Sequence, residues 1–292
     1  MTWVNAVLQG VLLGGFYALL ACGLSLIFGV MRIINLAHGD IAVLGAYLVF
    51  VIVEHTRLSP FLAFVAALPV MLAVGYLLQR TVLERSLRAG ILTPLLATFG
   101  LSIVLQNLLL IAFSPDVRSL GGSAGRISTA SFQLGHDISI SALGAVILAV
   151  AVVVVAGLHV FLARTRAGWV MRATAQDPDA AELIGVDSRA VYARATAIAV
   201  AIAALGGFFL AVRSVFDPGS GSTQLIFAFE AVVIGGMGSL WGTLLGGVLL
   251  GVSQTIGAQV NPQYAALAGH LVFLAVLVGR FGGVLPRLRG LR

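Results

Sequence analysis

The sequence contains no lysine, only one cysteine and very little charge of either sign. Only 10% of its 292 residues are charged, whereas a typical soluble domain has roughly 25%. Because 60% of the residues are hydrophobic, the chain is predicted to be an integral membrane protein and not a soluble domain. Cys22 has no second cysteine to pair with, so an intrachain disulfide is excluded.

All 17 basic residues are arginines. The absence of lysine excludes a phosphate-binding loop of the Gly-x-x-x-x-Gly-Lys type, whose lysine contacts the nucleotide phosphates. If transport by this chain is driven by ATP, another subunit must therefore bind the ATP and its Mg²⁺, and this chain is expected to hold no cofactor. His38 and Asp40 lack a neighbouring cluster of further ligands, so no metal site is predicted.

Helix-length apolar segments recur along the chain, and a membrane-spanning helix needs ~20 apolar residues. They lack the strict alternation of barrel strands, so the predicted fold class is an all-α polytopic membrane protein with one transmembrane domain over residues 1–292. About eight transmembrane helices are predicted, at 4–30, 33–53, 59–79, 92–113, 138–162, 191–212, 240–258 and 264–279. A re-entrant or broken half-helix is predicted at 225–236.

Arginines gather in three places, namely the predicted loops 80–91 and 163–190 and the tail after residue 279. By the positive-inside rule these places are cytoplasmic. Three predicted spans precede segment 80–91, so the N-terminus is expected outside and the C-terminus in the cytoplasm. The polar stretch 114–137, rich in Gly, Ser and Thr, is predicted to be an external loop.

The stretch "IINLAHGDIAVLG" raises the question of whether its polar residues lie in an aqueous loop or at membrane depth. If they formed a loop, the next helix would run from 41 to 53, which is roughly 20 Å and too short to cross the bilayer. A helix that begins near Ile33 is long enough. The residues thereby predicted to lie at membrane depth, beside the translocation path or at a helix break, are Asn35, His38, Gly39 and Asp40.

A second interrupted segment, "FEAVVIGGMGSLWG", lies late in the chain and carries Glu230. Paired, glycine-broken segments are a known sequence sign of a transport pathway. A carboxylate in the middle of a span costs roughly 2.5–3.5 kcal/mol, so neither Asp40 nor Glu230 is expected to face lipid. Each could line a cavity or cap a broken half-helix. The glycines assigned to this break are Gly235, Gly236 and Gly238.

Regular glycine spacing follows the late break. Gly238, Gly242 and Gly246 recur every four residues, and Gly247 and Gly251 repeat the interval. On a helix this spacing forms a smooth ridge that lets another backbone approach closely. Tight helix packing is therefore predicted along this segment.

Segment 163–190 is too polar to enter the membrane and contains the stretch "DPDAAELIG". An Asp-Pro pair is a helix start and the closing glycine is a helix stop. The residues of this short helix are Asp177, Pro178, Asp179, Ala180, Ala181, Glu182, Leu183 and Gly185. From the residues alone it is either part of a solvated loop or a docking helix for a cytoplasmic partner.

Three stretches together resemble one family. "NAVLQGVLLGGFYALLACGLSLIFGVMRIINLAHGDIAVLGAY", "RTRAGWVMRATAQDPDAAELIGVDSRAVY" and "FEAVVIGGMGSLWGTLLGGVLLG" are similar to segments of the branched-chain amino acid ABC transporter permeases, LivH type. The resemblance implies a permease of the bacterial inner membrane that carries branched-chain or other hydrophobic amino acids. It further implies a second permease subunit, two ATP-binding subunits and a periplasmic substrate-binding protein, with segment 163–190 as the coupling loop.

Two other functions are left open by the residues. A proton-coupled secondary transporter would use Asp40, His38 and Glu230 as a proton relay. An intramembrane enzyme would depend on His38, although no Gly-x-Ser-x-Gly elbow accompanies it. External loops 114–137 and 213–223 are the expected contacts of a binding protein. Lipid is expected around the spans and no nucleic acid partner is expected.

Overall fold

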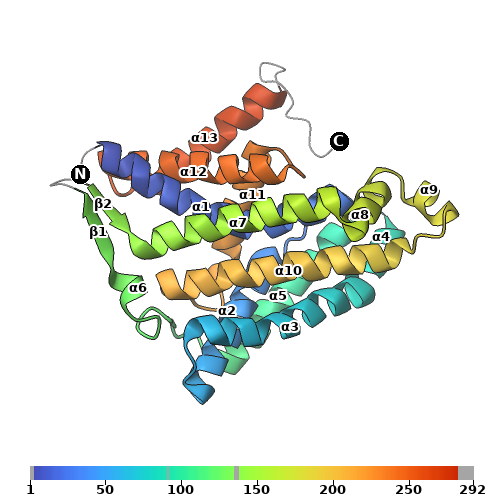
Figure 1. The fold of residues 1–292 in the computed structure, drawn as a ribbon, viewed down its shortest axis with the longest axis horizontal. Helices are drawn as coiled ribbons and strands as arrows, with labels where there is room; N and C mark the ends of the chain where they lie inside the picture. The colour runs from blue at the N-terminus through green and yellow to red at the C-terminus, as the bar shows by residue number, and fades with distance from the viewer. Residues whose placement is uncertain (1–2, 91, 135–137, 282–292) are drawn as a thin grey trace.

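The computed structural model describes residues 3–90, 92–134 and 138–281, and helices make up most of them (Figure 1). Among these residues, seven helices are long and apolar enough to cross a membrane. They are α1 (Trp3–Met31), α2 (His38–Thr56), the α3 helix with its continuation (Pro60–Ala89), α5 (Thr93–Phe113), α7 (Ala142–Arg164), α10 (Ser188–Arg213) and α12 (Leu240–Val260). The chain is thus a nearly all-α, polytopic membrane protein, as predicted.

Two shorter apolar helices complete the membrane region, α11 (Ser220–Gly235) and α13 (Tyr264–Phe281). Helix α13 corresponds to the predicted span 264–279. Helix α11 corresponds to the predicted half-helix, but it begins at Ser220 and not at residue 225. A turn at 236–239 reverses the chain, so α11 and α12 form a hairpin.

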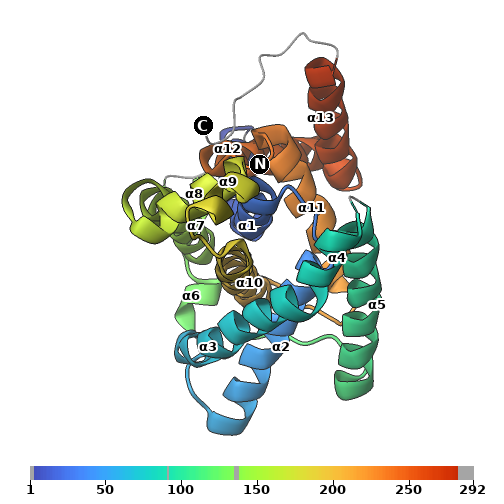
Figure 2. The same ribbon diagram turned by 90° about the vertical axis from the view of Figure 1, so that its right-hand side faces the viewer.

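Helices α1 and α10 form the buried centre of the bundle. Helices α1, α7 and α10 run in nearly the same direction, and Figure 2 looks roughly along them. Both central helices are rich in small residues, which allow close contact: Gly23 of α1 faces the carbonyl of Ala199, and Gly206 of α10 faces Leu20. Helix α5 lies at the edge and is largely exposed.

Helix α2 begins five residues later than predicted, at His38 and not near Ile33, and it ends at Thr56. Residues 32–37 are not helical. Two local features explain the late start. Arg32 has a left-handed backbone (φ 55°) that ends α1, and the Asn35 side chain accepts a hydrogen bond from the Ala37 amide at 3.0 Å. Such a side-chain turn competes with helix formation.

The prediction of a loop at 80–91 was wrong. Helix α3 (Pro60–Leu78) continues through a π-helical turn (Gln79–Leu83) into α4 (Glu84–Ala89) and stops at Gly90, whose φ is 135°. Glu84 accepts a hydrogen bond from Arg88 one turn later at 2.7 Å. Charges spaced by four residues stabilise an exposed helix end, so the arginines here extend the helix and do not interrupt it.

Segment 163–190 is mostly helical, with α8 (Arg166–Gln176) and α9 (Pro178–Leu183) between α7 and α10. We call the end of the molecule that carries α4, α8 and α9 the arginine-rich end, which is on the right in Figure 1. Thr165 caps α8 by accepting a hydrogen bond from the Gly168 amide at 3.0 Å. Helix α8 was not predicted, because the polar segment 163–190 was interpreted as a loop with one short helix.

The opposite end carries a small β-hairpin in the segment predicted to be an external loop. Helix α6 (Arg126–Thr129) is followed by strands β1 (Ser131–Leu134) and β2 (Ile138–Ser141), which pair antiparallel with Phe132 opposite Ile140. The predicted span 138–162 therefore starts too early. Helix α7 begins at Ala142, because Ser141 caps it by accepting from the Gly144 amide at 3.2 Å.

Candidate functional site

Asp40 is buried in the first turn of α2, where it receives two hydrogen bonds from α5. Ser102 donates to Oδ2 at 2.5 Å, and the amide nitrogen of Gln106 donates to Oδ1 at 3.0 Å. The same Gln106 nitrogen donates to the hydroxyl of Ser222, in the first turn of α11, at 3.0 Å. We call Asp40, Ser102, Gln106 and Ser222 the Asp40 cluster. It joins three helices that are far apart in the sequence.

The N-terminal ends of α2 and α11 touch at this cluster. A β-carbon on Gly39 would overlap the carbonyl of Gly221, and one on Gly221 would overlap Asp40. Only glycine therefore fits at either position. The positive ends of two helices lie next to the Asp40 carboxylate, an arrangement that stabilises a negative charge. This geometry suits a residue that shapes the helix break.

His38 and the Leu36 amide hold the non-helical residues 32–37 against α1 and α5. His38 Nε2 donates to the carbonyl of Leu20 at 3.0 Å. The Leu36 amide donates to the hydroxyl of Thr98 on α5 at 3.1 Å. Asn35 and His38 are both at most 1% exposed. These polar side chains are thus buried among helices, but Asn35 precedes α2 and does not lie within that span as predicted.

Glu230 lies on α11 and pairs with His270 on α13, with 2.5 Å between Oε1 and Nδ1. The ring of Phe227 stacks on His270 at 6.1 Å and tilts against Tyr17 at 5.0 Å. Tyr17 in turn donates to Gln254 of α12 at 2.6 Å. We call these five residues the Glu230 cluster. It joins α1, α11, α12 and α13.

The two clusters are separate. No hydrogen bond or ion pair in the described ranges connects His38, Asp40 and Glu230 to one another, and each has partners of its own. A proton relay requires such groups within hydrogen-bond reach of one another, directly or through water. The proton-relay hypothesis is therefore not favoured. Among the described residues, the side-chain hydrogen bond of His38 goes to the Leu20 carbonyl and not to a nucleophilic side chain.

The glycines of α12 face two different helices. A β-carbon on Gly242 would meet the carbonyl of Gly235, and one on Gly246 would meet that of Ala231, both on α11. The partners of the other pair lie on α1: Gly247 faces Gly14 and Ala18, and Gly251 faces Gly10 and Gly14.

Gly238 does not belong to the ridge in which the spacing placed it. It lies in the turn before α12, with φ 83°, and Gly236 in the same turn has φ 96°. Both backbone conformations favour glycine because they carry a positive φ. The spacing of four residues continued into the turn by coincidence, and the helical ridge consists of the glycines from 242 onward.

The predicted short helix in segment 163–190 is present as α9. Asp177 caps it by accepting from the Ala180 amide at 3.0 Å, and Pro178 occupies its first position. Gly185, with φ 87°, follows its last residue, Leu183. At the tip, Leu183 and Ile184 are 89% and 79% exposed. The helix thus presents apolar side chains at the extreme arginine-rich end (Figure 1).

Sequence reasoning missed the partners of both acids. Thr98, Ser102 and Gln106 recur every four residues in an otherwise apolar span. This polar stripe on one helix face was a signal that could have identified the α5 side of the Asp40 cluster. His270 gave no such signal, because it is a single histidine 40 positions from Glu230.

Residues 6–279 match the model of the family described as "Branched-chain amino acid transport system / permease component". The chain belongs to this family. The match extends over all the elements described above, so the Asp40 cluster, the Glu230 cluster and α9 are all parts of a permease. The family predicted from the three sequence stretches is confirmed.

Individual relatives agree with the family match. The permease is 32% identical to the high-affinity branched-chain amino acid transport system permease protein BraD of Pseudomonas aeruginosa, over 98% of this chain and 96% of BraD. It is 29% identical to LivH of Escherichia coli over the same shares. It is 27% identical to LivM of Escherichia coli over 94% of this chain and 68% of LivM. No solved structure matches.

Proposed function

We propose that this permease forms part of the translocation path of an ATP-driven importer of branched-chain or other hydrophobic amino acids. The observation that carries the proposal is the family match over residues 6–279. The relatives are named as permeases of branched-chain amino acid transport. No catalytic role is assigned to any residue of the chain.

In this proposal α9 is the coupling helix through which the ATP-binding subunits move the spans. Leu183 and Ile184 offer them an exposed apolar contact, flanked by the acids Asp179 and Glu182. The hydroxyl of Ser188, the first residue of α10, donates to the carbonyl of Pro178 at 3.4 Å, which links α9 to the start of α10. A push on α9 therefore reaches the buried centre of the bundle. ATP and Mg²⁺ stay on the partner subunits, because this chain has no phosphate-binding lysine.

The further partners are a second permease subunit, two ATP-binding subunits and a periplasmic substrate-binding protein. Escherichia coli has both a LivH and a LivM to which this chain is similar, which supports a pair of unlike permeases. The arginine-rich end is assigned to the cytoplasm and the N-terminus to the outside. Three arginines of the tail, Arg287, Arg289 and Arg292, lie outside the described residues.

The path is proposed to pass beside the Asp40 cluster, where α2 and α11 begin. Helix α5 contacts the rest of the chain mainly along α2 and α4 and leaves much of its surface exposed. A helix attached on one side and tied by Gln106 to the first turns of two other helices is suited to move during alternating access.

Two experiments test the proposal. In vesicles that contain the permease and its co-purified subunits, uptake of leucine should require ATP and should survive dissipation of the proton gradient. Uptake driven by a proton gradient without ATP would contradict it. For the coupling helix, replacing Asp179 and Glu182 together with arginine should abolish co-purification of the ATP-binding subunits. The control is Asp116→Arg, an exposed acid at the opposite end, which should leave co-purification intact.

A further inference from the structure

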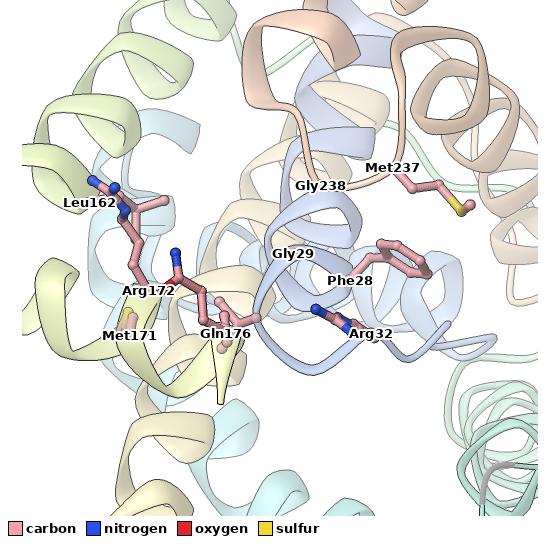
Figure 3. Close-up of a pocket in the computed structure, with 11 residues that line it drawn as sticks. Phe28, Gly29, Arg32, Leu162, Met171, Arg172, Gln176, Met237 and Gly238 are labelled. Atoms are coloured by element: carbon pink, nitrogen blue, oxygen red, sulfur yellow. The ribbon is translucent and has the colours of Figure 1, made fainter. Parts of the chain in front are cut away.

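A pocket of about 250 Å³ lies at the arginine-rich end, between the ends of α1 and α7, helix α8 and the turn 236–239. Figure 3 shows its lining, with Arg32 and Arg172 on opposite sides of it. The side chains that define its character are Phe28, Arg32, Met171, Arg172, Gln176 and Met237. None of its lining residues belongs to the Asp40 cluster, the Glu230 cluster or α9, so none of the proposed transport steps uses it.

The pocket has an unbalanced positive charge. No aspartate or glutamate is among the residues that line it. Within the described residues, neither Arg32 nor Arg172 has a side-chain hydrogen bond or ion pair. At the same end, Arg80, Arg88 and Arg189 all pair with Glu84, whereas Arg32 and Arg172 line the cavity without such a partner among the described residues. Two unpaired guanidinium groups beside one cavity indicate an anionic ligand.

Apart from Gln176, the other side chains that line the pocket are apolar. Phe28 comes from α1 and Met237 from the turn, whereas Leu162 comes from α7 and Met171 from α8. The ligand that matches these walls has an anionic group joined to hydrocarbon. Gln176 adds an amide that can donate to the same group.

The pocket also lies at the depth of a membrane surface. It sits where apolar helices α1 and α7 end and the arginine-bearing helix α8 begins. On α8, Trp169 is 59% exposed, and its indole nitrogen donates to the carbonyl of Ala163 at 2.6 Å. Exposed tryptophan at the end of a span is typical of the interface between hydrocarbon and water. Basic pockets between spans at this level bind anionic lipid headgroups.

We propose that this pocket binds the phosphate of an anionic phospholipid, with Arg32 and Arg172 as the cationic contacts and the apolar walls against the glycerol and upper acyl chain. A lipid bound there would join α1, α8 and the α11–α12 turn. The assignment is independent of which solute the permease carries.

The test measures lipid binding to the full-length chain in detergent by native mass spectrometry and by thermal unfolding. Phosphatidylglycerol should bind and raise the unfolding temperature, whereas phosphatidylcholine, inorganic phosphate and leucine should not. Arg172→Gln should weaken phosphatidylglycerol binding about fivefold, the loss expected for one cation near an anionic headgroup. Arg166→Gln, on the same helix but outside the pocket lining, should leave binding unchanged.

A charge-retaining variant separates binding from folding. Arg172→Lys should keep most of the affinity for phosphatidylglycerol. Arg172→Gln should show the weaker phosphatidylglycerol binding, but its unfolding temperature in lipid-free detergent should be unchanged. Equal loss in Arg166→Gln would show nonspecific attraction of lipid and would overturn the proposal. If inorganic phosphate raised the unfolding temperature as much as phosphatidylglycerol does, the pocket would be assigned to a free anion. If leucine did so, the pocket would be assigned to the transported solute. Either result would also overturn the proposal.

Discussion

Gln106 donates a hydrogen bond to Asp40 at 3.0 Å across 66 positions of sequence. Together with the hydrogen bond from Ser102 to Asp40, this contact attaches the exposed helix α5 to the first turn of α2, and the further bond from Gln106 to Ser222 extends the link to α11. The N-terminal ends of α2 and α11 are thus held by polar side chains of a neighbouring span. The first prediction concerns this link.

Gln106→Leu should reduce both stability and uptake. The substitution removes the hydrogen bonds from Gln106 to Asp40, Ser102 and Ser222 and leaves Asp40 with Ser102 as its remaining side-chain partner, which should cost about 1–3 kcal/mol. Thermal unfolding and ATP-driven uptake measure the two effects. Asn107→Leu is the matched control, because Asn107 is exposed and its side chain bonds only to Ile103 in its own helix. Equal behaviour of the two variants would contradict a special role of Gln106.

Gly207→Ala should destabilise the permease, because the added β-carbon would overlap the backbone of a neighbouring helix. A β-carbon there would coincide with the carbonyl of Ala42, where α10 crosses α2, and neither helix can yield locally. Overpacking of this kind costs typically 1–3 kcal/mol. Gly100→Ala is the control, since nothing lies within 4 Å of its added carbon. A denaturation series should show a loss for Gly207→Ala alone.

Variants of the Glu230 cluster distinguish a structural pair from a proton carrier. Glu230→Gln retains a hydrogen-bonding partner for His270 and should keep most of the ATP-driven uptake. His270→Ala removes the ring that meets Glu230 and Phe227, leaves the acid without its partner and should lower the unfolding temperature. Loss of uptake in Glu230→Gln with unchanged stability would instead support proton transfer by this residue.

The cap of α9, the proposed coupling helix, can be tested without altering its exposed surface. Asp177→Ala removes the side-chain acceptor for the Ala180 amide and should destabilise α9 by about 1 kcal/mol. Because α9 is only six residues long, this loss should increase its amide hydrogen exchange and weaken binding of the ATP-binding subunits. Asp177→Asn preserves an acceptor and should behave like the unmodified chain. Unchanged exchange in Asp177→Ala would show that the cap is dispensable.

Predictions from the sequence succeeded where the signal was local. The Asp177-Pro178 pair and Gly185 located α9 because capping and termination depend on neighbouring residues. They failed where a local signal had two meanings. The arginines at 80–88 were taken as a loop, but at four-residue intervals around Glu84 they stabilise a helix. Gly238 fitted a helical interval yet lies in a turn.

The sequence by itself determined the membrane fold, the family and the position of the two interrupted segments. Each of these follows from composition, segment length or contiguous motifs, which do not depend on contacts between distant residues. Only the tertiary structure decided what the buried acids meet. Asp40 meets Gln106, 66 positions away, because α2 packs against α5. Glu230 meets His270, 40 positions away, because α11 packs against α13. Helix periodicity shows which face a residue occupies, but the neighbour of that face depends on how the whole bundle packs.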